Sequence, residues 1–219
     1  MGVPIPLNSR RMSDHDHEHG HDHDHGDHDH DHAGHDHAHE HDQDDRAEQQ
    51  ARRRVALSQI RQYGDPVLRM RANEVDAYDE ELDRLTERMI GLMHDAEGVG
   101  LAATQVGILR RLFVFHDNDE DRVIVNPVLT VRGNETEVDE EGCLSLGPIR
   151  MPVERAVEVT LDGFDAEGKA VHLELEGMSA RVVQHELDHL DGKMIIDRTD
   201  PDSRREAMAQ LRPRLVLSR

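Results

Sequence analysis

The sequence predicts an α+β domain in which antiparallel strands lie between helices. Three observations support this prediction: an amphipathic helical pattern at 79–96, a series of short β-branched segments between 110 and 177, and a second helical pattern at 178–190. Strands that cluster between helices, instead of alternating with them, are typical of α+β architecture. At 219 residues the chain is long enough for one domain with a substantial core.

Residues 13–45 form a low-complexity segment of acidic residues and histidine. They contain 13 Asp and Glu residues, 13 of the 18 His residues, and neither Lys nor Arg. Because almost no apolar surface is present to offset the entropy of ordering, we expect residues 1–50 to form a disordered extension and residues 51–219 to form the folded domain. The segment carries 13 of the 21 net negative charges. This acidic balance argues against a broad basic surface for nucleic acid.

The first expected element of the folded domain is an amphipathic helix at 79–96. Its apolar residues recur at helical spacing, which places them on one stripe that packs against a core. Gly98 and Gly100 follow and are expected to end the helix. The stripe consists of Leu82, Leu85, Met89, Leu92, Met93 and Ala96.

Short apolar segments rich in β-branched residues follow this helix. Several alternate apolar with polar residues, which is typical of antiparallel strands with one solvated face. Turn residues such as Asn126-Pro127 and Gly133-Asn134 separate them. The expected strands lie at 110–117, 122–127, 128–133, 156–164 and 170–177.

The second helix, expected at 178–190, contains the letters QHELDH, and a short helix is expected at 203–211. His185 and His189 are four residues apart and therefore project from the same helix face, an arrangement that lets two imidazoles bind one metal ion. Glu186 lies beside them. The other face of the helix is expected to anchor it in the core through Val183, Leu187 and Leu190.

Two imidazoles need at least one more protein ligand to hold a metal ion. His94, His116 and His172 are each expected to be surface or core residues rather than ligands. Cys143 is the only cysteine, which excludes an intramolecular disulfide. In the stretch EEGCLSLG it is either a buried small side chain, which base rates favour, or a thiolate that approaches the helix. The residue pattern alone leaves both alternatives open.

Three separated stretches resemble the signature motifs of peptide deformylases, and they occur in that family's order. They are GVGLAATQ at 98–105, EGCLS at 141–145 and QHELDH at 184–189. The similarity covers about residues 56–198 and includes GDPVLR near the start of the domain. The resemblance implies a peptide-deformylase-like fold, with antiparallel strands around a central HExxH helix.

The resemblance also implies a metal site made by Cys143, His185 and His189. It therefore selects the cysteine that base rates alone assign to the core. In that family a metal-bound hydroxide attacks the formyl group, and Glu186 is expected to act as the general acid and base.

Further site residues follow from the first two motifs. The resemblance implies that Gln105 and the backbone N–H of Leu144 stabilise the oxyanion of the tetrahedral intermediate. It also implies that Gly98, Val99 and Gly100 bind the peptide substrate as an added strand. Read without the resemblance, the two glycines simply end a helix.

The implied reaction removes the N-terminal formyl group from the formylmethionine of newly synthesised proteins and releases formate. The implied cofactor is one divalent ion, expected to be Fe²⁺ in the cell and Zn²⁺ or Ni²⁺ as purified. The expected partners are formyl-Met N-termini of nascent polypeptides near the ribosome, without direct nucleic-acid binding. No apolar run approaches the roughly 20 residues of a membrane span, so we expect no membrane association and a cytoplasmic location.

Two stretches depart from the pattern common in that family. Leu146-Gly147-Pro148 stands where Ile-Pro often follows the second motif, and VERAVEVT stands where VPRA is common. These differences affect the expected methionine pocket rather than the reaction.

Other functions remain compatible with the motifs. A metallopeptidase that cleaves internal bonds requires a third His or Glu ligand further along the chain, and the stretch HELDHLDGKMIID lacks that His. A non-enzymatic metal-buffering protein would depend on the His-rich extension, which is expected to bind Ni²⁺, Zn²⁺, Co²⁺ or Cu²⁺. That extension either buffers or delivers metal to the catalytic site or has no part in turnover. A deformylase-like domain without activity is a third alternative, although Glu186 is present.

Overall fold

The computed structural model describes residues 36–217, which form four α-helices and one antiparallel sheet. Its five strands follow in chain order, β1-β2-β3-β4-β5, and each pairs with its neighbours antiparallel. The expected α+β class is therefore confirmed. The helices are α1 (Asp36–Gln59), α2 (Glu80–Asp95), α3 (Gly177–Leu190) and α4 (Pro201–Leu217); the strands are β1 (Gly100–Ala102), β2 (Leu112–Asp117), β3 (Glu120–Gly142), β4 (Arg150–Phe164) and β5 (Ala170–Glu176).

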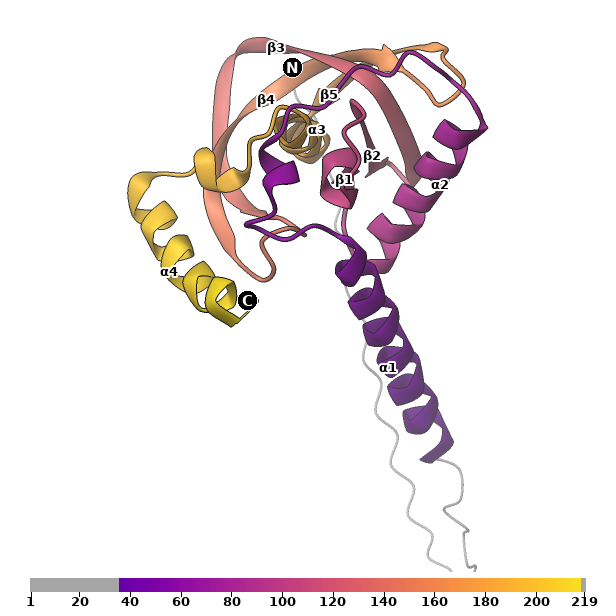
Figure 1. Cartoon of the computed structure of the whole chain (residues 1–219), viewed down its shortest axis with the longest axis vertical. Helices are drawn as coiled ribbons and strands as arrows, with labels where there is room; N and C mark the ends of the chain where they lie inside the picture. The colour runs from indigo at the N-terminus through magenta and orange to yellow at the C-terminus, as the bar shows by residue number, and fades with distance from the viewer. Residues whose placement is uncertain (1–35, 218–219) are drawn as a thin grey trace, which may run out of the picture.

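Helix α3 lies in the middle of the domain, with the strands curved around it (Figure 1). It packs against β1, β2, β4 and β5. Val183 and Leu190 are fully buried, as the sequence predicts, whereas Leu187 is only half-buried. Burying one face of this helix leaves its histidine face directed at the loop that follows β3.

Helix α2 matches its predicted range, and its whole apolar stripe is buried. Asp79 caps the start, because its side chain accepts hydrogen bonds from two backbone N–H groups of the first turn. The end differs from expectation. Glu97 adopts the left-handed conformation with φ of 59°, and the N–H of Gly98 donates to the carbonyl of Met93 at 2.9 Å. The helix thus ends at Asp95 with Ala96 as its C-cap, and Glu97, rather than Gly98 or Gly100, takes the left-handed position that follows.

Strand β3 combines two segments that the sequence predicts as separate strands. A register shift between Val125 and Val128 marks the place where the turn at Asn126-Pro127 was expected. Asn126 has φ of 52°, and its side-chain amide bonds both the N–H and the carbonyl of Val75 at 2.8 Å. The Asn-Pro pair therefore forms a bulge within a continuous strand instead of a turn. The three-residue strand β1 was not predicted.

Helix α1 includes residues that the sequence assigns to the disordered extension. Residues 36–50 are helical, whereas residues 1–35, with most of the His-rich segment, lie outside the described part of the chain. The helical part continues into RAEQQARRRVALSQ, which is rich in strong helix formers. Its end is anchored because Ala56, and Ile60 directly after the helix, are buried in the same core cluster as the apolar stripe of α2. Figure 1 shows that the rest of α1 projects away from the domain.

Helix α4 begins at Pro201 and is longer than predicted. Asp200 caps it by accepting from the N–H groups of Asp202 and Ser203 at 2.9 and 3.1 Å. Ala207 and Leu211 then pack on the core. Over the described residues 36–217, we find no helix that is both long and apolar enough to span a bilayer.

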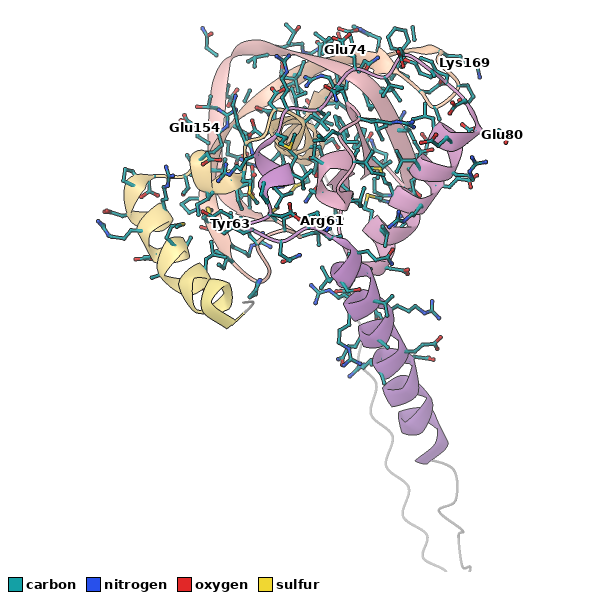
Figure 2. The ribbon with its side chains drawn as sticks, in the orientation of Figure 1. Arg61, Tyr63, Glu74, Glu80, Glu154 and Lys169 are labelled. Carbon is teal, nitrogen blue, oxygen red and sulfur yellow. The ribbon has the colours of Figure 1, made fainter. Side chains whose placement is uncertain are left out.

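The segment between α1 and the first 3₁₀ turn ties two motif loops together. Figure 2 shows Arg61 and Tyr63 on this segment. The N–H of Arg61 donates to the carbonyl of Gln105 at 2.7 Å, and the N–H of Tyr63 donates to the carbonyl of Ser145 at 2.8 Å. Because one short segment holds both loops, their relative position is fixed by backbone hydrogen bonds.

Candidate metal centre

Three side chains predicted as metal ligands meet between α3 and the loop after β3. Cys143 Sγ lies 3.2 Å from Nε2 of His189. One ligand atom each from Cys143, His185 and His189 lie within 4.8 Å of one another. The two imidazole rings are 5.0 Å apart between centroids, one helical turn from each other. Cys143 is thus both buried, as base rates predict, and directed at the two rings.

Glu141 fixes the orientation of His185. Its carboxylate Oε2 lies 3.0 Å from Nδ1 of His185. A carboxylate accepts hydrogen bonds, so Nδ1 carries a proton and Nε2 remains free to face the thiol. A carboxylate behind a histidine is the arrangement that orients metal-binding imidazoles in proteins.

Glu141 belongs to a buried ion-pair network. Arg155 donates to both of its carboxylate oxygens, at 2.9 and 3.0 Å, and Arg181 donates to Oε1 at 2.9 Å. Burial would raise the pKa of Glu141, but the hydrogen bonds from His185 and Arg155 outweigh it and lower the pKa to about 2. Glu141 therefore stays ionised behind His185.

The network extends to the helix between the two histidines. Arg155 Nη1 donates to Asp188 at 2.6 Å, and Arg198 Nε donates to the same carboxylate at 3.0 Å. Neither Arg155 nor Asp188 was identified from the sequence as part of the site. Both lie in stretches that were compared with the family. Asp188 lies inside QHELDH, and Arg155 lies in VERAVEVT, where the arginine is kept although that stretch departs from the family pattern.

The protonation of the histidines differs between the two rings. Burial, and then the charge of His185, lowers the pKa of His189 well below its ordinary value. For His185, burial alone would lower the pKa, but hydrogen bonds to Cys143 and Glu141 raise it well above the ordinary value. Of the two rings, His185 is therefore the one whose protonated form its surroundings favour.

Glu186 is buried beside the ligands and only 3% exposed. Burial raises its pKa to about 7. Its Oε2 is buried and has no hydrogen-bond partner within the described part of the chain. A buried carboxylate oxygen without a partner indicates a position for water or substrate.

The first glycine motif makes room for this carboxylate. A Cβ atom placed on Gly100 would collide with Oε1 of Glu186, and one on Gly98 would lie 2.9 Å from Cδ1 of Leu144. Gly100 is therefore required by the close approach of β1 to α3. This reason differs from the helix-ending role that the sequence suggests.

Gln105 presents its amide nitrogen to the centre. Its Oε1 accepts from the N–H of Ala102 at 2.9 Å, which fixes the orientation of the amide. Its Nε2 then lies 3.1 Å from Ser145 Oγ and 3.8 Å from Cys143 Sγ. The side chain is 2% exposed, so its donor group faces the site rather than bulk solvent.

A cleft of about 800 Å³ opens over these residues. The predicted substrate-binding stretch from Gly98 to Gly100 forms one wall, together with Leu144 and residues of α3. Among the described residues, His94, His116 and His172 are not part of the group formed by Cys143, His185 and His189. The cleft thus joins all nine predicted site residues except His189, which lies beneath it.

A family model described as polypeptide deformylase matches residues 57–205, more than half of the chain. The chain belongs to the peptide deformylase family. Curated peptide deformylase 1 from Corynebacterium efficiens is 45% identical over 157 residues, which cover 70% of this chain and 93% of that relative. Most of α1 precedes the matched span.

Solved peptide deformylases share the fold. The crystal structure from Thermotoga maritima has a TM-score of 0.63 at 48% identity and covers 65% of this chain and 97% of that chain. The crystal structure from Thermus thermophilus has a TM-score of 0.68 at 42% identity, with 72% and 95% covered. Peptide deformylases are metal-dependent hydrolases. Of the functions considered from the sequence, family membership therefore favours an enzyme over a protein that only buffers metal.

Proposed function

We propose that this chain hydrolyses the formamide of N-terminal formylmethionine with one divalent ion held by Cys143, His185 and His189. The observation that carries the proposal is the meeting of this thiol and two imidazoles beside the buried carboxylate of Glu186. Family membership supports removal of the N-terminal formyl group from new proteins.

The donor set suits a divalent ion of intermediate softness. A thiolate with two imidazoles fits Fe²⁺, Zn²⁺ or Ni²⁺, and three protein ligands leave a coordination position open. The ion-paired Glu141 behind His185 supports this assignment, because it keeps Nε2 directed at the centre. We propose Fe²⁺ in the cell and Zn²⁺ or Ni²⁺ after aerobic purification.

When bound, the ion supplies Lewis acidity to water and to the formyl oxygen. Glu186 then accepts the proton released by the attacking water and passes it to the leaving amine. A carboxyl group with a pKa of about 7 suits both steps, because it gains and loses a proton readily near neutral pH. Amide hydrolysis needs such a transfer since an amide anion is a poor leaving group.

Two donors support stabilisation of the oxyanion that forms on the former carbonyl. Gln105 offers Nε2, whose direction is fixed by the bond from Ala102 to Oε1. Leu144 offers its backbone N–H, which has no backbone partner among residues 36–217. Donors that are oriented before the reaction stabilise the developing charge without reorganisation.

Strand β1 is suited to bind the peptide. It lies at the edge of the sheet and pairs only with β2 among the described strands. Val99, just before it, is 56% exposed. An extended substrate can therefore add to this edge, with its formyl group directed at Glu186 and its methionine side chain toward the apolar residues Leu144, Ile149 and Val182 of the cleft.

The setting of the reaction follows from its substrate. We propose that the enzyme acts in the cytoplasm on nascent chains near the ribosome, and that the His-rich extension binds divalent metal and supplies it to the centre. Removal of residues 1–35 leaves α1 in place and tests this supply. If the shortened chain recovers activity at limiting metal as fast as the full chain, the extension has no such role.

The proton-transfer role of Glu186 is the part most open to a direct test. The full chain, purified anaerobically, is assayed for formate release from formyl-Met-Ala while its metal content is measured. Glu186→Gln should lower kcat at least about 100-fold with the metal retained. Glu206→Gln, an exposed change on α4, should behave like wild type. Wild-type turnover by Glu186→Gln would overturn the mechanism.

A further inference from the structure

A second group of metal-binding side chains lies outside the catalytic centre. His94, His116 and Asp121 place one ligand atom each within 4.8 Å of one another. Both carboxylate oxygens of Asp121 lie 2.8 Å from Nε2 of His94, and Oδ1 lies 2.8 Å from Nδ1 of His116. The imidazole rings are 5.5 Å apart between centroids. Nothing in the proposed reaction uses these residues.

Three separate elements hold this group in position. His116 on β2 and Asp121 on β3 are direct cross-strand partners. His94 lies in the last turn of α2, where its carbonyl accepts from the N–H of Glu97 at 2.9 Å. The group therefore rests on a paired hairpin and a capped helix end rather than on a loose loop, so its ligands need little ordering before they bind.

The donor types define the class of ligand. Two imidazoles and one carboxylate are the ligands that borderline divalent ions such as Zn²⁺, Co²⁺ and Ni²⁺ accept. All three side chains are partly exposed, between 29% and 47%, so water can complete the coordination. A thiolate is absent from the group, which favours weaker binding than at Cys143.

We propose that His94, His116 and Asp121 form a second divalent-cation site on the β2–β3 hairpin. The ion binds Nε2 of His94 and Nδ1 of His116, the two nitrogens that now face Asp121. Each ring proton on these nitrogens leaves or moves to the other nitrogen of its ring when the ion binds. The two histidines are thus bound through opposite ring nitrogens, which gives the site a distinct spectroscopic signature.

The chain contains a matched pair that lacks the third ligand. His172 on β5 and Asp162 on β4 are also cross-strand partners, and Nδ1 lies 2.7 Å from Oδ1. No second imidazole completes this pair among the described residues. It therefore reports on what an isolated His–Asp pair on a strand binds under the same conditions.

The test uses the full chain labelled with ¹⁵N-histidine, with Zn²⁺ as the probe. A chelating buffer holds the concentration of free Zn²⁺ constant. Uptake by the His-rich extension therefore does not change the concentration available to the β2–β3 hairpin. Long-range ¹H–¹⁵N spectra are assigned with His94→Gln, His116→Gln and His172→Gln. We expect the His94 and His116 rings to change together along one binding curve, after the catalytic centre has filled and before His172 responds.

Two variants separate a site from a pair of surface histidines. Asp121→Asn should weaken Zn²⁺ binding at both rings at least about tenfold. Asp162→Asn, which alters the matched pair, should leave that binding unchanged. The proposal fails if the His94 and His116 rings titrate independently, if they change only when His172 does, or if Asp121→Asn binds as well as Asp162→Asn. None of these outcomes depends on formate release.

Discussion

Gly100 lies so close to Glu186 that a methyl group at position 100 would take the space of the carboxylate oxygen Oε1. This contact joins the first motif to the third across β1 and α3. Gly100 is therefore needed because it leaves space for the carboxylate of Glu186, the proposed proton carrier, and not because of its backbone conformation.

Gly100→Ala should therefore lower kcat sharply while the fold is kept. The added Cβ displaces the Glu186 carboxylate, and loss of a positioned acid–base group costs about 100-fold or more. Steady-state formate release measures kcat, and elemental analysis shows whether the metal remains. Gly91→Ala on α2 is the control, because a Cβ at that position meets nothing within 4 Å. Equal activity of the two variants would show that the contact does not position Glu186.

Gln105→Ala removes an oriented donor and should reduce kcat by about 100- to 1000-fold with a smaller effect on KM. The donor acts on charge that develops during the reaction, so substrate binding depends on it less. Gln59→Ala removes an exposed amide on α1 that accepts from Arg88 at 3.0 Å and does not line the cleft, and it serves as control. A loss confined to KM for Gln105→Ala would contradict the assigned role.

Glu141→Gln should weaken metal retention about 10- to 100-fold. The amide can still accept from His185, but it no longer supplies the negative charge that Arg155 and Arg181 hold behind the ring. The rate of metal loss to a chelator in the folded protein measures this effect. Glu140→Gln, which changes the exposed neighbour, should release metal at the wild-type rate.

The sequence was sufficient for much of the fold because its signals are local. The stripe of α2 and the alternation of β4 and β5 follow from side-chain periodicity within each element. β3 was divided in two because Asn126-Pro127 carries a strong turn signal, and only the contact of Asn126 with Val75 turns it into a bulge. That contact spans 51 residues, beyond the reach of a local pattern.

Prediction of the site residues was also limited by the short range of sequence patterns. The pair His185 and His189 could be found from helical spacing alone, whereas Cys143 was selected only by resemblance to a family. Glu141 and Arg155 were given no role, although both lie in stretches compared with the family, because a buried ion pair between two strands leaves no periodic signal. The structure reveals them through burial and paired distances.

Glu141 also makes the stability of the domain depend on pH. Its pKa is lowered from 4.5 to about 2 in the folded chain, because hydrogen bonds from His185 and Arg155 outweigh the effect of burial. The folded state therefore binds fewer protons than the unfolded state between these values. The stability from ionised Glu141 is fully present above pH 4.5 and is lost as the pH falls toward about 2.

The difference between wild type and Glu141→Gln isolates this contribution. Protonated Glu resembles Gln, so the gap in free energy of unfolding between the two chains should be largest above pH 4.5 and should close as the pH approaches about 2. Urea unfolding of both metal-free chains at a series of pH values measures the gap, and removing metal keeps acid release of the ion out of the comparison. A gap that stays constant over this range would mean that Glu141 titrates alike in the folded and unfolded states, and that Arg155 does not hold its charge.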